Sequence, residues 1–560
     1  MENWKENFLF FAKNKVYVLL LSLTAVASYG FMITHHAVGI DDTPYSLYFE
    51  EGLAAIVGRW VLFVLNKVVT IGDFAPYLTD LAGVLILMVA VTVWSTLFYT
   101  ILKDRIPGYG YLFFACVFLS CPLISEVYVY HLHNGVAIGY LCSGISLCFF
   151  LEGLKWSKKS LACFAGSLLS LWIALGCYES FMMVWLVGIC IILMLKRMCG
   201  ERVKVFAAIG TAGAVGLCVM VVRSITIAVV TGVFGLEALR DDAVQRSVME
   251  LVGWILQEDA MAKFAMVLKR TYLMYVVFGC AYYPIRIFLL ATVVILIAAI
   301  VYSIRRKDGW IFLLSVAAYV AAFSLIVIEG KETYYRCAQF LPVICGFGVL
   351  VCAGGVSAFE KKLISGAKNG TAEVRRRKIA GLSRGVACMM LTVILWNQCA
   401  DMNKWFYVDW QKYETAKETM QNVAYELERK FDTTKPIVFT GIYEAPVSII
   451  QDAYVSYSSQ EYKIMLLMTT WMDEHLLEKF YRSPGVWVVQ QPTLSVIEWG
   501  KNAFDNNAEL TKFFEMHGYH LVPNMDMELY ETAEEYSLEL PAFPREGSIV
   551  DMGEYIIVHF

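Results

Sequence analysis

The sequence predicts an α-helical membrane protein with about eleven transmembrane helices and an extracytoplasmic α/β domain at its C-terminus. Of its 560 residues, 58% are hydrophobic and only 17% are charged. Soluble domains average about 45–50% apolar and about 25% charged residues, so the composition excludes a soluble enzyme, a disordered chain and a disulfide-rich secreted domain. The apolar residues form separate runs near the length of about 20 residues that a membrane-spanning helix needs. Nothing in the charge pattern indicates a nucleic-acid partner.

Eleven apolar runs are predicted to span the membrane. Lys and Arg cluster in alternate connections between them, as the positive-inside rule requires when the N-terminus is cytoplasmic. The richest cluster, Lys361 to Arg384, is a topology anchor in the simpler interpretation and a site for anionic membrane lipid in the alternative. An odd number of spans then places the C-terminus outside the cell membrane. The expected spans are residues 16–34, 78–102, 109–125, 134–153, 160–177, 180–196, 205–234, 284–304, 309–328, 337–358 and 384–400.

The chain divides into a membrane domain, 1–400, and an extracytoplasmic domain, 401–560. The second part has 26 Asp and Glu against 12 Lys and Arg, whereas the first is net basic. A helical pattern from Trp410 to Lys430 precedes short apolar strands that begin near Ile437, Val486 and Tyr555. Helices alternating with such strands favour a partly parallel, Rossmann-like sheet.

The first outer loop carries an adjacent acidic pair, Asp41 and Asp42, before Thr43-Pro44. Pro suits the first turn of a helix, so we expect an amphipathic helix over 45–69 that includes Arg59. Helix capping is the structural interpretation of the two carboxylates, and proton transfer is the functional one.

Two further charged residues lie where short connections leave little room for them. Glu179 stands in the turn between two spans, and Arg223 lies near the outer end of another. An ionisable group at membrane depth is costly and is therefore a functional candidate. A structural Glu–Arg pair across the bundle is the alternative.

Two more outer loops add candidates. Residues 329–336 contain Lys331 and end in Arg336, which we expect at headgroup depth, either as a phosphate ligand or as a snorkelling anchor. His131 and His133 lie in another short outer loop, which either binds a metal ion or is merely polar. All these candidates fall on one face, where a lipid-linked substrate would place its polar head.

The acidic pair, the sequence Gly58-Arg59-Trp60 and the turn Gly176-Cys177-Tyr178-Glu179-Ser180 together resemble the serotype-converting, Gtr-type glucosyltransferases that modify O-antigen. The likeness covers roughly residues 1–400, and Glu179 stands where the family would have Gln. It implies a GT-C fold in a bacterial cell membrane, with the active site on the outer face.

The resemblance also implies the reaction: a hexose, glucose above all, passes from polyprenyl phosphate to an exported cell-surface glycan with inversion. Asp41 or Asp42 would be the base, or in some relatives a metal ligand, so that Mg or Mn as cofactor stays open. Glu179 joins the catalytic candidates. The substrate-binding candidates are Arg59, Trp60, His133, Tyr178, Arg223, Lys331 and Arg336.

Three other functions remain as alternatives. A transporter or flippase of lipid-linked glycans would use the same charges, but the chain shows no repeated halves. A glycan polymerase or ligase would share the donor class. A binding module anchored in the membrane would not need eleven spans.

Overall fold

The computed structural model describes residues 2–37, 53–65, 76–128, 133–235, 253–258, 260–272, 275, 286–329, 335–365, 371–441, 467, 470–471, 511, 514–515, 517–524 and 526–560. Within these residues, ten helices are long and apolar enough to cross a membrane, so the chain is a multi-pass membrane protein. One of them runs from α6 through η4 into α7. The spanning elements are α2 (Lys15–Thr34), α5 (Pro76–Leu102), α6 (Gly108–Leu119), η4 (Pro122–Ile124), α7 (Ser125–Tyr128), α8 (His133–Gly153), α9 (Ser160–Cys177), α10 (Phe181–Met198), α11 (Val205–Val233), α15 (Arg286–Arg306), α18 (Leu341–Ser365) and α19 (Thr371–Lys430).

Each predicted span is largely helical in its described part. The span 109–125 is interrupted at Ser120 and Cys121, between α6 and η4, and a second span is divided. The segment 309–328 forms α16 (Gly309–Ala322) and α17 (Ser324–Glu329), which are separated at Phe323. The Ser324 hydroxyl donates a hydrogen bond to the Ala321 carbonyl beside the break. This segment is therefore helical as predicted, but neither piece alone is long enough to span the bilayer. The other described helices are α1 (Glu2–Ala12), η3 (Lys103–Arg105), α3 (Leu53–Ile56), α4 (Trp60–Leu65), η6 (Gly253–Leu256), α13 (Ala260–Tyr272), η8 (Tyr335–Cys337) and α24 (Met527–Ser537).

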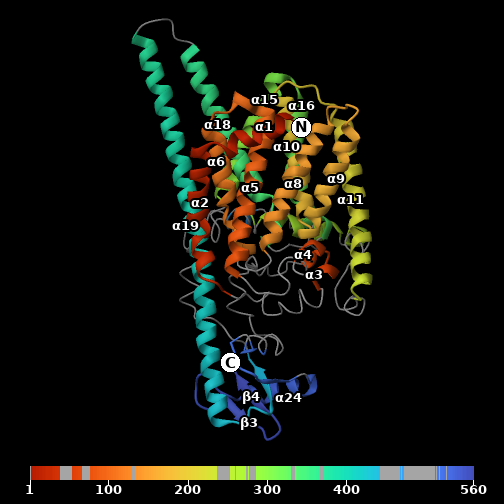
Figure 1. Ribbon diagram of the computed structural model, residues 1–560, viewed down its shortest axis with the longest axis vertical. Helices are drawn as coiled ribbons and strands as arrows, with labels where there is room; N and C mark the ends of the chain where they lie inside the picture. The colour runs from red at the N-terminus through yellow and green to blue at the C-terminus, as the bar shows by residue number, and fades with distance from the viewer. Residues whose placement is uncertain are drawn as a thin grey trace.

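The prediction of one continuous helix over 45–69 is wrong. Between 53 and 65 the chain forms two short helices, α3 and α4, with Gly58 and Arg59 between them. Gly58 has a φ of +90°, a left-handed conformation that ends α3. Both short helices lie at the same end of the bundle as the C-terminal region (Figure 1).

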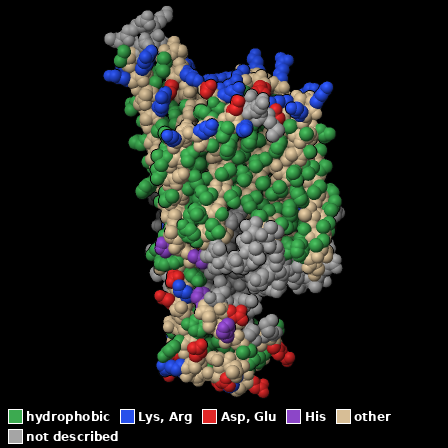
Figure 2. Space-filling view, viewed as in Figure 1, with side chains coloured by type: hydrophobic (Ala, Val, Ile, Leu, Met, Phe, Trp, Pro, Cys, Tyr) green, Lys and Arg blue, Asp and Glu red, His purple; other side chains and the backbone are tan. Residues whose placement is uncertain are grey.

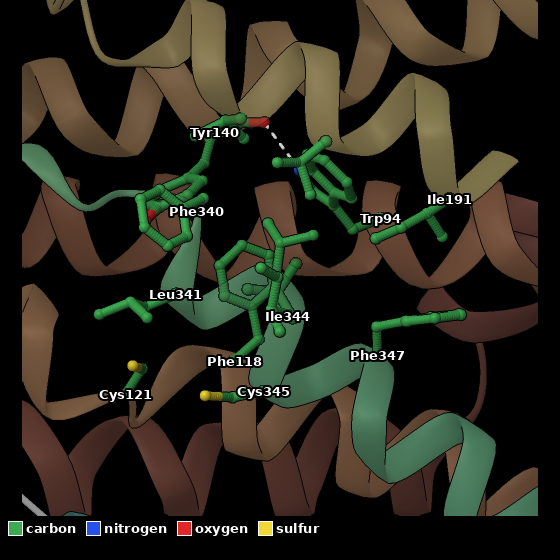
Figure 3. Close-up of a cluster of buried hydrophobic side chains, with 14 of the residues drawn as sticks. Trp94, Phe118, Cys121, Tyr140, Ile191, Phe340, Leu341, Ile344, Cys345 and Phe347 are labelled. Carbon is green, nitrogen blue, oxygen red and sulfur yellow. Dashed lines mark hydrogen bonds between the residues drawn. The ribbon is translucent and has the colours of Figure 1, made fainter. Parts of the chain in front are cut away.

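Large aromatic side chains fill the centre of the bundle. Trp94 of α5 is fully buried and donates a hydrogen bond from Nε1 to the Tyr140 carbonyl of α8, 3.0 Å away. The Phe118 ring lies edge-on to Tyr140, and Phe340 and Phe347 lie in the same cluster (Figure 3). This core fixes α5, α6, α8 and α18 relative to one another, and thus the ends of these helices.

Charge is distributed unevenly along the bundle. Lys and Arg gather at the end that holds the N-terminus, and hydrophobic side chains cover the flank below them (Figure 2). The C-terminal region lies at the opposite end (Figure 1). This arrangement matches the predicted alternation of basic connections.

The long helix α19 links the bundle to the C-terminal region. The predicted span 384–400 and the predicted helix 410–430 are parts of this one helix, which passes through the expected domain boundary at residue 400. Met402, Trp405 and Phe406 belong to the core of the bundle. Met420 and Leu427 belong to a second core, so one rigid helix contributes to both.

A small mixed sheet forms the C-terminal core. Its four strands lie in the order β2-β1-β4-β3, and β1 pairs parallel with β2 and β4, while β3 and β4 are antiparallel. Side chains alternate across β1: Ile437 and Phe439 face α19, whereas Val438 packs with residues of α24. The expected partly parallel α/β fold is confirmed, and the expected strand at Val486 lies outside the described residues. The strands are β1 (Pro436–Thr440), β2 (Val522–Pro523), β3 (Ile549–Asp551) and β4 (Ile556–His559).

Candidate functional site

Three charged side chains from distant parts of the sequence meet at the end of the bundle that holds α3 and α4. Arg59 Nε lies 4.0 Å from Glu179 Oε2, and Arg223 Nη2 lies 3.7 Å from Glu179 Oε1. Arg59 precedes α4, Glu179 lies in the turn between α9 and α10, and Arg223 lies inside α11. We call Arg59, Glu179 and Arg223 the arginine site.

The backbone around Arg59 is held from both sides. The Arg59 N–H donates to the Ala54 carbonyl and the Gly58 N–H to the Ala55 carbonyl, which is the Schellman pattern that closes a helix. The Arg59 carbonyl then accepts from the N–H of Leu62, the first turn of α4. Because hydrogen bonds to both neighbouring helices fix the Arg59 backbone, they also fix the position from which its side chain extends.

Gly58 also makes room for the second guanidinium. A Cβ atom at this position would collide with Nη2 and Cζ of Arg223. The glycine therefore serves two purposes, the left-handed turn and the close approach of α11. The sequence Gly58-Arg59 thus brings both arginines to one place.

Tyr178 lies beneath Arg59. The Arg59 guanidinium carbon lies 4.6 Å from the centre of the Tyr178 ring, within the range of a cation–π contact. The Tyr178 hydroxyl lies 3.5 Å from Cys337 Sγ in η8. Burial raises the pKa of the Tyr178 hydroxyl well above its usual range, so this group is a neutral hydrogen-bonding phenol and not a base.

Trp60 forms an aromatic wall next to the arginine site. Its ring stacks on Trp172 of α9, with centroids 4.5 Å apart. Gly176 gives it space, since a Cβ there would collide with the Trp60 indole. Trp172 Nε1 in turn donates to the Thr226 hydroxyl, one turn along α11 from Arg223. These contacts tie α4, α9 and α11 together around the site.

Arg336 lies in η8 and not at the start of the next span, which begins at Leu341. The correction follows from the 3-10 turn, whose Arg336 carbonyl accepts a hydrogen bond from Gln339 Nε2. Its charge, with that of Arg59, acts electrostatically on Tyr178. Arg336 therefore lies within electrostatic range of Tyr178, the residue beneath Arg59.

Four predicted site residues have no described side chain. Asp41, Asp42 and Lys331 lie outside the described residues, and His133 is the first residue of α8, with its side chain undescribed. Their roles stay predictions. In the described part of the chain, no group of three His, Cys, Asp or Glu side chains is arranged to hold a metal ion.

Among the described residues, Asp80, Glu126, Asp409 and Lys412 are buried ionisable groups that were not among the predicted site residues. Asp80 lies near the start of α5 and Glu126 lies in α7, each almost fully buried. Asp409 and Lys412 are buried on α19. Asp80 lies inside an expected span and Glu126 one residue past one, so the cost of charge at membrane depth was a usable signal for both.

The arginine site is well suited to binding an anion. Charge-assisted hydrogen bonds measure about 2.7–2.9 Å, so Glu179 holds both guanidiniums at longer than bonding distance. In the described part of the chain, Arg223 Nε is buried without a hydrogen-bond partner. Guanidinium groups match the oxygens of phosphate, and burial among helices strengthens the attraction.

Comparison with known proteins places the chain in a family. Residues 30–353 match the family model of Glucosyl transferase GtrII, which covers more than half of the chain and every residue of the arginine site. No curated protein and no solved structure matches the chain. The matched region ends before α19, so the C-terminal sheet lies beyond it.

Proposed function

Because the chain belongs to the GtrII glucosyl transferase family, we propose that it transfers glucose from a polyprenyl-phosphate donor to an exported cell-surface glycan. Family membership makes the protein a glycosyltransferase enzyme with many membrane spans. The lipid-linked donor, the exported acceptor and the inverting mechanism go beyond family membership and are part of this proposal.

The arginine site is the observation that carries the proposal. Arg223 lies within a membrane-spanning helix, and the side chains of Arg59 and Arg223 are largely buried. A water-soluble sugar nucleotide would have little reason to bind there. A polyprenyl phosphate keeps its tail in lipid and presents its phosphate at the depth of the two guanidiniums, with Arg336 nearby.

The reaction can be written with these groups. The acceptor hydroxyl oxygen forms a bond to the anomeric carbon while the bond from that carbon to the phosphate oxygen breaks, and polyprenyl phosphate leaves with the electron pair. Asp41 or Asp42 removes the hydroxyl proton, and attack opposite the phosphate inverts the anomeric configuration. Arg59, Arg223 and Arg336 stabilise the charge on the leaving phosphate, and Glu179 positions the first two.

Trp60 and Tyr178 complete the donor site in this proposal. An aromatic face packs well against the apolar C–H face of a hexose, and the neutral Tyr178 hydroxyl is a hydrogen-bonding group. Asp41 and Asp42 are the ligands that the proposal offers to a divalent cation, Mg or Mn. Adding EDTA to the transfer assay tests whether the reaction needs one.

The proposal also requires the arginine site and the C-terminal sheet to face the outside. The gathering of Lys and Arg at the other end supports this orientation under the positive-inside rule. In a variant lacking the native cysteines, Glu534→Cys should react with an impermeant maleimide in intact cells, whereas Arg305→Cys should react only after lysis. The opposite pattern would contradict the orientation and remove the outward-facing site.

Transfer itself is tested with membranes from cells that contain or lack the protein. Both are incubated with radiolabelled polyprenyl-phosphate-glucose, and label in the extracted glycan is counted. We expect label only where the protein is present. Equal labelling of both samples, or movement of intact lipid-linked sugar across vesicles without transfer, would contradict the proposal.

A further inference from the structure

A second set of buried charges lies where the bundle meets the C-terminal region. Asp409 and Lys412 are one turn apart on α19, between residues of the bundle core such as Phe406 and residues of the C-terminal core such as Ala416. Glu126 of α7 lies within electrostatic range of both. We call Glu126, Asp409 and Lys412 the junction cluster.

The junction cluster is almost completely removed from solvent. Glu126 and Lys412 are each 1% exposed and Asp409 is 4% exposed. Within the described part of the structure, Lys412 Nζ is buried and has no hydrogen-bond partner. A buried ammonium is stable only when it is paired and hydrogen-bonded, so an unbonded one calls for an explanation.

A second acidic–basic pair on the same helix, with the same spacing as Asp409 and Lys412, does form an ion pair. Lys417 and Glu414 have the same spacing along α19, and Lys417 Nζ bonds Glu414 Oε1 at 2.6 Å. Lys412 makes no such bond to Asp409 despite the equal spacing. The spacing along the helix therefore does not explain why Lys412 lacks a hydrogen bond. Its ammonium group is buried, and its N–H donors have no acceptor in the described part of the structure.

The junction cluster lies close to the proposed donor site. Helix α7, which carries Glu126, packs against both α19 and η8. Within η8, Cys337 contacts the Tyr178 hydroxyl, and Tyr178 in turn lies under Arg59. The short turn η8 thus connects the junction cluster to the arginine site at one end of the bundle.

The charges of the junction cluster select the kind of ligand. Two carboxylates accept hydrogen bonds and repel a phosphate, while one ammonium donates them and disfavours a metal cation. A neutral ligand with many hydroxyl groups satisfies both kinds of group, since each hydroxyl donates and accepts. Sugar hydroxyls have this chemistry.

We propose that Glu126, Asp409 and Lys412 bind hydroxyl groups of the glycan acceptor, next to the donor held at the arginine site. This inference rests on the proposed function and assigns its acceptor subsite. It places the acceptor against α19, outside the segment that matches the family. The C-terminal region then shares in acceptor binding through the helix that carries two of the three residues.

The test separates acceptor binding from donor chemistry. Full-length protein in membrane vesicles receives radiolabelled polyprenyl-phosphate-glucose and the glycan fraction extracted from membranes of cells that lack the protein. Lys412→Met and the isosteric Asp409→Asn should raise the KM for the glycan by about tenfold or more, because each removes a buried polar contact. The KM for the donor, and its slow hydrolysis without glycan, should stay within about twofold of the wild type.

Lys417→Met is the matched control and should leave both constants unchanged. A second measurement needs no turnover: the glycan fraction should raise the thermal midpoint of the wild type but not that of Lys412→Met. An unchanged KM for the glycan, or equal losses toward donor and acceptor, would overturn the inference. A wild type that transfers no glucose from the donor to the glycan contradicts the proposed function itself, and that result is seen before any variant is made.

Discussion

Arg223 and Glu179 face each other 3.7 Å apart, although one lies within α11 and the other in the turn between α9 and α10. The carboxylate is shared, because Arg59 approaches its other oxygen at 4.0 Å. Two positive charges around one negative charge leave a net attraction for a further anion. The distances are longer than charge-assisted bonds, which suits guanidiniums that bind a second, transient partner.

Replacing Arg223 or Arg336 by Lys tests the phosphate-binding assignment. Lys keeps the charge but lacks the planar fork that binds two phosphate oxygens together, so each variant should lose about tenfold or more in kcat/KM for the lipid-linked donor. Arg384→Lys is the control for the general effect of an Arg→Lys change on membrane insertion, and it should leave donor kinetics unchanged. Arg384 makes a bidentate ion pair with Glu360 at the other end of the bundle. Wild-type donor kinetics in either variant would remove that residue from the site.

Gly58→Ala tests whether the arginine site depends on the turn before α4. The new Cβ would collide with the Arg223 guanidinium and would strain a residue whose φ is +90°. We expect the KM for the donor to rise by about tenfold or more while the protein still inserts. Gly235→Ala is the matched control, since its φ is +67° but its surroundings are open. Equal effects of both changes would show that backbone strain alone is responsible.

The two acidic residues of the first outer loop remain the predicted bases. Asn caps a helix as well as Asp does but cannot accept a proton near neutral pH. Asp41→Asn and Asp42→Asn should therefore leave the thermal midpoint nearly unchanged, while at least one of them abolishes transfer. If radiolabel transfer falls by less than about tenfold in both variants, capping is the better explanation.

The C-terminal sheet should weaken in acid through one ion pair. Asp551 accepts bonds of 2.9 and 2.7 Å from Lys435 Nζ, and this contact lowers the pKa of the Asp551 carboxyl. A lowered folded-state pKa stabilises the fold above the unfolded value of about 3.9, and this stabilisation is lost as pH falls through the folded value.

Amide hydrogen exchange of β3 in the full-length protein measures this effect. Lys435→Met should reduce protection at neutral pH, and its difference from the wild type should vanish once the carboxyl is protonated. Lys430→Met, which removes an exposed pair with Glu426, is the control and should leave protection in β3 unchanged. A difference between Lys435→Met and the wild type that is independent of pH would contradict the assignment.

The sequence predicted the parts of this molecule that depend on local physics. Apolar run length located the spans because lipid requires helices of a minimum length, and the short apolar run that begins at Ile437 located a strand. The predicted helix over 45–69 failed because Gly58 adopts a left-handed conformation that ends α3, at a point where the approach of Arg223 also leaves no room for a Cβ atom.

Contacts between distant residues could not be predicted in this way. The sequence marks Glu179 and Arg223 as costly charges at membrane depth and offers a Glu–Arg pair as one of two interpretations. Only the folded bundle shows that Arg59 approaches the same carboxylate. Asp409 and Lys412 escaped notice because they sit in a helix with an ordinary polar pattern. Only the packing of α7 against α19 makes them a buried cluster with Glu126.

The central claim is that the sugar comes from a lipid-linked phosphate and not from a sugar nucleotide. Purified protein in liposomes is given the extracted glycan fraction with either radiolabelled polyprenyl-phosphate-glucose or radiolabelled UDP-glucose, and label in the glycan is measured. The arginine site predicts labelling from the polyprenyl donor alone, with free polyprenyl phosphate released in equal amount. Labelling from UDP-glucose without any polyprenyl phosphate, or no labelling from the polyprenyl donor, would contradict it.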